Sequence, residues 1–279
     1  MVCDVLELAE FYASPKGEGA ALALRRQVGK LWPDLRGQRV LGLGYALPVM
    51  AGLGGSGRPH SMLAMMPERQ GVVPWQAGPP PRPGGRGAGN VSALVRPQHL
   101  PLRDAMLDKV LLLHGLEHSA HDTGMLREVW RVLAPGGTMI VVVPNRMSIW
   151  ARMESTPFGH GTPYSRTQLA RRLRGALFTP LDWRMALAMP PVRGLAAGRS
   201  LEITGTRFWP RLAGVHVVLA QKQMAAMMPS GGQRARLPRL VPATGGVPAG
   251  AASNLPSTSA QFEDGLGGEE IGMAQGKRA

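Results

Sequence analysis

The segment LREVWRVLAPGGTMIVVVPN, residues 126–145, carries two hydrophobic periods in succession. Four apolar residues spaced i, i+3, i+4 and i+7 form one stripe of a helix: Leu126, Val129, Trp130 and Leu133. Pro-Gly-Gly at 135–137 cannot continue a helix and permits the positive φ of a tight turn. The run at 139–143 is apolar without alternation, which predicts a strand covered on both faces, as in a parallel sheet.

Similar apolar runs elsewhere predict further strands. Strong runs occur at 38–45, 108–114 and 215–220, and weaker ones at 62–66 and 92–95. Helices are predicted at 19–31 and 165–177, and the segment 189–203 is expected to hold a connector and an edge strand. Helices that alternate with buried strands predict an α/β fold, namely a Rossmann-like, doubly wound, mostly parallel sheet with helices on both faces.

Changes in composition divide the chain into three predicted parts. Residues 1–36 form an N-terminal helical segment, and residues 37–228 form the Rossmann-like domain, with a loop-rich acceptor region at about 145–210. Residues 229–279 are rich in Pro, Gly, Ser and Ala, so we expect a disordered tail.

Overall composition narrows the class of protein. The chain has 279 residues, of which 44% are hydrophobic, and one cysteine, which excludes a disulfide framework within one chain. The start MVCDVLELAEF has acids where a signal peptide has a basic region, and the chain has no apolar run of about 20 residues that could span a membrane. We therefore expect a cytoplasmic protein with no membrane association, whose oligomeric state the sequence leaves open.

The formal net charge of +14 raises the possibility of nucleic-acid binding. Only five of the 32 basic residues are lysines, however, and the chain also has 37 Gly and 25 Pro, a bias that a GC-rich coding sequence produces by itself. Aromatic residues make up 5% of the chain, and none interleaves with a basic run to form a stacking platform. Nucleic acid is therefore disfavoured as a partner.

Four motifs occur in a characteristic order. They are VLGLGYA at 40–46, LPL at 100–102, DKVLLLHGLEH at 108–118 and LREVWRVLAPGG at 126–137. This order resembles class I S-adenosylmethionine-dependent methyltransferases of the type-11 kind, over about residues 38–145. The resemblance implies S-adenosylmethionine as cofactor and methyl transfer to an unidentified, small-molecule acceptor.

The resemblance also implies where the cofactor lies, across the carboxyl ends of the first strands. Matching positions fall against its amino-acid part (Gly42, Leu43, Gly44, Tyr45), its ribose (Met66), its adenine (Gln98, His99) and its sulfonium side (His114, Gly115). Glycine has no Cβ and so lets a cofactor approach the backbone. On this interpretation, Gly44→Val abolishes cofactor binding and leaves the helical circular dichroism signal intact.

Three departures from the family pattern support an alternative. Ala46 stands where the family usually has a third glycine. Met66 stands where the family has an acid that binds the ribose hydroxyls, and Glu68 lies two positions further along the chain. Residues 96–99 read RPQH where the family carries another acid. The alternative is a non-catalytic, methyltransferase-like binding protein that no longer binds the cofactor.

Candidate catalytic residues are His118 and two side chains of the FGHGTPYS segment, His160 and Tyr164. A neutral imidazole accepts a proton near pH 7, and functional groups concentrate on loops. The segment HGLEH at 114–118 also matches a zinc-peptidase pattern in which both histidines lie on one helix face. Because His114 ends a strand and Gly115 follows, a shared helix is disfavoured, and the sequence analysis predicts no metal site.

Overall fold

The computed structural model describes residues 3–53, 57, 59–75, 91–188 and 213–224. The tail predicted from residue 229 and the connector predicted at 189–203 lie outside the described residues.

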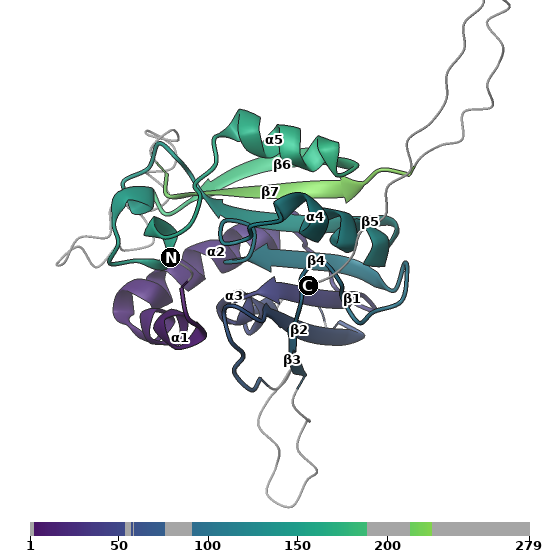
Figure 1. The fold of residues 1–279 in the computed structure, drawn as a ribbon. Helices are drawn as coiled ribbons and strands as arrows, with labels where there is room; N and C mark the ends of the chain where they lie inside the picture. Colours follow the sequence, from purple (N-terminus) through teal and green to yellow (C-terminus); the bar gives the residue numbers. More distant parts are fainter. Residues whose placement is uncertain (1–2, 54–56, 58, 76–90, 189–212, 225–279) are drawn as a thin grey trace, which may run out of the picture. The chain divides into compact units, whose positions relative to one another are not determined.

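The described residues form one seven-stranded sheet with strand order β3-β2-β1-β4-β5-β7-β6 (Figure 1). The strands are β1 (Arg39–Gly44), β2 (Ser61–Pro67), β3 (Ser92–Val95), β4 (Leu107–Leu113), β5 (Leu133–Pro144), β6 (Phe178–Ala186) and β7 (Val215–Lys222). Neighbours among the first five strands pair in parallel, whereas β7 is antiparallel to both β5 and β6. The order 3-2-1-4-5 is that of a doubly wound nucleotide-binding sheet, so the predicted fold class is confirmed.

Helices cover both faces of the sheet. They are α1 (Val5–Ala13), α2 (Pro15–Leu31), α3 (Leu47–Met50), α4 (Asp122–Val132) and α5 (Arg166–Gly175), with 3-10 turns η2 (Trp150–Arg152) and η3 (Pro157–Gly159). Residues of α1, α2 and α3 belong to one buried cluster, and residues of α4 and α5 to another. Among the described residues, no helix is long and apolar enough to cross a membrane.

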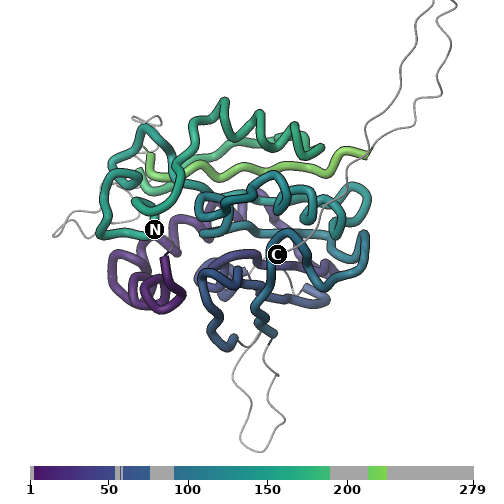
Figure 2. Tube along the Cα trace, viewed as in Figure 1, coloured from purple at the N-terminus to yellow at the C-terminus, as the bar shows by residue number. Residues whose placement is uncertain are grey.

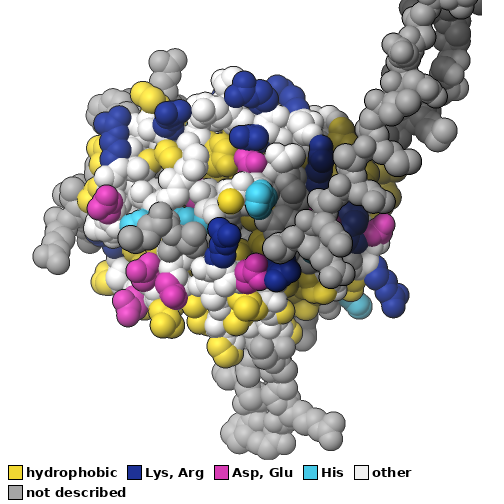
Figure 3. Space-filling view, viewed as in Figure 1, with side chains coloured by type: hydrophobic (Ala, Val, Ile, Leu, Met, Phe, Trp, Pro, Cys, Tyr) yellow, Lys and Arg dark blue, Asp and Glu magenta, His cyan; other side chains and the backbone are white. Residues whose placement is uncertain are grey.

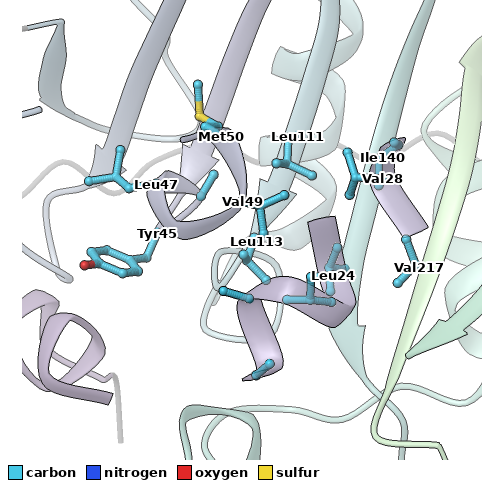
Figure 4. Close-up of a cluster of buried hydrophobic side chains, with 14 of the residues drawn as sticks. Leu24, Val28, Tyr45, Leu47, Val49, Met50, Leu111, Leu113, Ile140 and Val217 are labelled. Carbon is cyan, nitrogen blue, oxygen red and sulfur yellow. The ribbon is translucent and has the colours of Figure 1, made fainter. Parts of the chain in front are cut away.

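Alternate residues of the central strands supply the two cores. Leu111 and Leu113 of β4 pack toward α2 and α3, as the close-up in Figure 4 shows, whereas Leu112 packs toward α4 and α5. All three side chains are fully buried. This two-sided burial explains why the run at 108–114 is apolar without alternation.

The N-terminal helices pack on the sheet and beside the segment that follows β5 (Figure 2). The rings of Phe11 and Phe158 lie 6.2 Å apart, edge to face. Helix α2 was predicted, although it begins at Pro15, four residues before the predicted start. Helix α1 lies within the predicted N-terminal helical segment, although its own bounds were not predicted, and a capping box of Asp4 and Glu7 caps its N-terminus.

Two strands differ from the prediction. Strand β5 begins before the Pro-Gly-Gly turn, because Leu133 already pairs with Leu107, and the register then shifts before Thr138 pairs with Lys109. Strand β6 was not predicted at all. Pro180 interrupts its pattern and accompanies a second register shift, which is the usual place for a proline in a sheet.

Candidate functional site

A cavity of about 420 Å³ opens at the carboxyl ends of three neighbouring strands. Its wall is formed by residues 67–70 at the end of β2, residues 96–99 after β3, residues 114–115 and 118–121 after β4, and Met125 of α4. The carboxyl ends of parallel strands are where open α/β sheets bind their ligands. Its volume lies within the range of small-molecule sites.

The predicted cofactor-binding residues divide into two groups. Four line the cavity: Gln98, His99, His114 and Gly115. Five do not: Gly42, Leu43, Gly44, Tyr45 and Met66. After β2, the wall is formed instead by Pro67 and Glu68, directly after Met66.

The two glycines of the predicted cofactor turn are required by neighbouring parts of the fold. A Cβ on Gly42 would collide with the Met50 sulfur, and a Cβ on Gly44 would collide with the carbonyl oxygen of Leu113. Gly44 also has φ +82°, which L side chains rarely adopt. The expected reason for glycine at 44, space for the cofactor, is therefore incomplete, because β4 already fills the position of a side chain.

Glu68 is an acid that reaches the cavity after β2. Its backbone N–H donates to the Val95 carbonyl at 2.9 Å, and its Oε2 accepts from Arg96 Nε at 3.1 Å. The Glu68 side chain is 48% exposed, so the carboxylate can also reach a ligand in the cavity. Glu68, two positions after the place where the family carries its ribose-binding acid, is thus directly at the end of β2.

Gln70 contributes a buried polar group to the same wall. Its Nε2 donates to the carbonyl oxygen of His114 at 2.9 Å. Its Oε1 has no hydrogen-bond partner among the described residues. A buried acceptor without a donor is expected to bind a ligand or a water molecule.

Three side chains of the HGLEH segment converge beside the cavity: His114, Glu117 and His118, called here the His-Glu-His cluster. His114 Nδ1 lies 3.3 Å from Glu117 Oε1, and one ligand atom from each residue lies within 4.8 Å of the other two. His114 and Glu117 are buried, and both ring nitrogens of His118 are buried too. Tyr12 of α1 completes the surroundings, with its hydroxyl in a hydrogen bond of 2.8 Å to His114 Nε2.

Burial and neighbouring groups shift the pKa values in this region. Burial raises the pKa of Glu117, but the adjacent His114 and His118 outweigh burial and hold the pKa below its usual value. Burial lowers the pKa of His118, and burial raises the pKa of Tyr12 well above its usual value. These shifts favour a charged Glu117, a neutral His118 and a protonated Tyr12 near pH 7.

The FGHGTPYS segment packs over the His-Glu-His cluster. The Phe158 ring lies 4.9 Å from that of His114, and the Thr162 N–H donates to the Glu117 carbonyl at 2.8 Å. Two motifs that the sequence analysis considered separately therefore lie together.

Of the three candidate catalytic residues, only His118 lines the cavity. His160 Nε2 donates to the Glu154 carbonyl at 2.8 Å. Tyr164 is buried, its hydroxyl lies 3.5 Å from Asp122 Oδ2, and burial raises its pKa. The roles of His160 and Tyr164 stay predictions.

Two residues of this region escaped the sequence analysis, Tyr12 and Gln70. Tyr12 is 102 positions from its partner His114, so local patterns give no signal for the contact. Gln70 lies three residues after the end of β2 and could have been proposed from its place near a strand end.

Charged side chains are mixed on the face drawn in Figure 3. Basic side chains gather over α5, which carries Arg166, Arg171, Arg172 and Arg174, and acidic ones gather over α1. This face therefore does not present a single basic surface of the kind that tracks a phosphate backbone.

Comparisons with known proteins agree with the fold and the motifs. Residues 86–141 match a family model described as a methyltransferase domain. No curated protein matches the sequence closely enough to serve as a relative.

Solved structures share the fold. A Thermotoga maritima S-adenosylmethionine-dependent methyltransferase, described as a possible histamine N-methyltransferase, has a TM-score of 0.53 and 18% identity, covering 78% of this chain and 96% of its own. A putative methyltransferase solved in complex with the Haloferax volcanii Trm112 activator has a TM-score of 0.54 and 16% identity, with the same coverages of 78% and 96%. At these identities the likeness concerns the fold alone.

The family match covers residues 86–141, and the strand order and the cavity at the strand ends agree with that match. In this segment and in its fold the chain resembles class I S-adenosylmethionine-dependent methyltransferases, whose cofactor is S-adenosylmethionine.

Proposed function

We propose that this protein is an active enzyme that transfers a methyl group from S-adenosylmethionine to a small-molecule acceptor in the cavity. The observation that carries the proposal is the position of the cavity at the carboxyl ends of β2, β3 and β4, within a chain of this family. The cavity is large enough for a small molecule and carries a carboxylate, an amide acceptor and imidazoles.

We assign residues of the wall to successive parts of the cofactor. Glu68 would accept hydrogen bonds from the ribose hydroxyls, because it is the carboxylate nearest the end of β2. Gln98 and His99 would hold the adenine, after β3. Gln70 Oε1, which has no partner within the described part of the chain, would accept a hydrogen bond from the amino group of the amino-acid end.

When bound, S-adenosylmethionine supplies an electrophilic methyl group. The protein's own contribution is to hold donor and acceptor in line and to exclude water, which converts an encounter of two molecules into a reaction within one complex. His118 is the predicted base that lines the cavity, and its lowered pKa keeps it neutral and able to accept a proton. A base is needed only for acceptors that lose a proton during transfer.

Calorimetric titration with S-adenosylmethionine and S-adenosylhomocysteine, with NAD as the control ligand, tests the cofactor. We expect the first two to bind and NAD not to bind. Glu68→Gln should weaken binding by about 10- to 100-fold, because the hydrogen bonds that would be lost are to a charged group. Glu10→Gln, on the exposed face of α1, is the matched control and should leave the affinity unchanged.

Two outcomes would contradict the proposal. A folded protein that binds neither cofactor form would favour the non-catalytic binding relative. Equal affinity in wild type and Glu68→Gln would show that the ribose is held elsewhere.

A further inference from the structure

We propose that the His-Glu-His cluster is a binding site for one divalent transition-metal ion, with His114 Nδ1, a Glu117 carboxylate oxygen and a His118 ring nitrogen as ligands. The three ligand atoms come from one short segment after β4, and His118 would not be free to accept a proton during methyl transfer while it binds a metal ion.

The spacing of the ligand atoms fits a metal ion. Zinc–nitrogen and zinc–oxygen bonds of about 2.0–2.2 Å in a tetrahedral site place two ligand atoms about 3.4 Å apart. His114 Nδ1 and Glu117 Oε1 are 3.3 Å apart. One ligand atom of each of the three residues lies within 4.8 Å of the other two, so a metal ion would draw the His118 nitrogen closer than it lies in this structure.

Several buried polar atoms of the cluster make no hydrogen bond within the described part of the chain, although His114 and Glu117 lie close enough for an ion pair. Both oxygens of Glu117, Nδ1 of His114 and both nitrogens of His118 have no hydrogen-bond partner among the described residues. The Glu117 side chain is 1% exposed, and an ionised carboxylate this deeply buried requires a counter-charge and donors. A metal ion would supply the charge and satisfy all three side chains at once.

The surroundings orient His114 as they do in known metal sites. Metal-bound histidines commonly donate their other ring N–H to a fixed partner, which sets the tautomer and the ring orientation. Tyr12 is such a partner for Nε2, at 2.8 Å, and leaves Nδ1 as the ligand. His114 also has φ +52°, a conformation that is uncommon for a residue other than glycine and that concentrates at functional sites.

The sequence disfavours zinc because the two histidines are not expected to share a helix. The structure agrees on that point, because residues 114–118 form a turn. The absence of a helix does not separate the ligands, however, since the turn itself brings them together. Nitrogen and carboxylate donors favour zinc or ferrous iron over magnesium or calcium, which prefer oxygen ligands.

Titration of tag-free, chelator-stripped protein with Zn²⁺ tests the site directly. We expect one ion per chain at micromolar affinity or tighter, and no heat with Mg²⁺. Co²⁺ should give visible absorption bands that Zn²⁺ displaces. Glu117→Gln and His118→Asn should each weaken zinc binding by at least about tenfold, because each removes a ligand.

His121→Asn is the matched control, because His121 lines the same cavity but lies outside the cluster, and it should bind zinc like wild type. No zinc binding by folded, stripped wild-type protein would overturn the proposal, whether or not the ligand variants fold. Zinc binding that survives in both Glu117→Gln and His118→Asn would also overturn it. Because the probe is the metal alone, these results do not depend on whether S-adenosylmethionine binds.

Discussion

Replacement of Gly44 by alanine is expected to destabilise the protein strongly, although alanine adds only one methyl group. Gly44 ends β1 with φ +82°, and a Cβ there would meet the carbonyl oxygen of Leu113 and lie about 3.0 Å from the carbonyl carbon of His114. Both contacts are with the backbone of the neighbouring strand β4 and its end, which cannot rotate away as a side chain can.

The magnitude follows from two contributions. The left-handed conformation costs an L residue about 1–2 kcal/mol relative to glycine. Forcing a methyl group into a filled space costs about 1–3 kcal/mol more. The free energy of unfolding of Gly44→Ala should therefore be about 2–5 kcal/mol lower than that of wild type. At about 2–4 °C per kcal/mol for a domain of this size, the melting temperature should fall by roughly 10 °C.

Urea unfolding followed by circular dichroism measures this difference, with Gly19→Ala as the control. Gly19 is exposed in α2, and a Cβ there has nothing within 4 Å, so alanine should stabilise the helix by about 0.5–1 kcal/mol. A Gly44→Ala variant as stable as wild type would refute the argument that β4 fills the space. The variant Gly44→Val, expected from the sequence to lose only cofactor binding, should instead lose structure, so its loss of binding would not locate the cofactor.

Three further expectations follow from other parts of the structure. Burial lowers the pKa of His216 from 6.5 to about 4, so the unfolded chain takes up a proton first and stability falls as the pH drops through that window. The loss is about 2 kcal/mol between about pH 7 and pH 5. Urea unfolding at both pH values should show a smaller loss in His216→Leu than in wild type, because the lowered pKa of His118 also contributes. Tyr12→Phe should weaken zinc binding by about tenfold in a calorimetric zinc titration, because His114 loses the hydrogen bond that orients its ring. Unchanged zinc affinity would show that Tyr12 does not support the metal site. Arg131→Ala should lower the free energy of unfolding by about 2 kcal/mol, because the Arg131 guanidinium binds Glu128, Asp104 and two backbone carbonyls. A melting temperature equal to that of wild type would contradict this expectation.

The sequence predicts the central strands well because burial on both faces leaves a clear pattern. Strands β4 and β5 are apolar without alternation, and their place on either side of α4 gives the parallel pairing. Strand β6 escapes because Pro180 and the charged Asp182 and Arg184 break its pattern at the edge of the sheet. Helix α1 could have been found, since Asp4 and Glu7 have the spacing of a capping box.

The candidate site could be predicted only in part. Residues directly after a strand, such as Gln98 and His99, follow from the general rule that ligands bind at strand ends. The convergence of the His-Glu-His cluster does not follow from spacing, because it depends on the positive φ of His114. The glycines were assigned to the cofactor although their neighbours are Met50 and Leu113, and only tertiary packing reveals that.

The contact between Tyr12 and His114 also bears on how the protein is made. The two residues are 102 positions apart, and at synthesis rates of about 5–20 residues per second His114 leaves the ribosome roughly 5–20 s after Tyr12. During that interval α1 has neither its hydrogen-bond partner nor the sheet that buries Leu8. Until β4 has emerged, the apolar face of the N-terminal helix therefore has no sheet to pack against and stays accessible to chaperones.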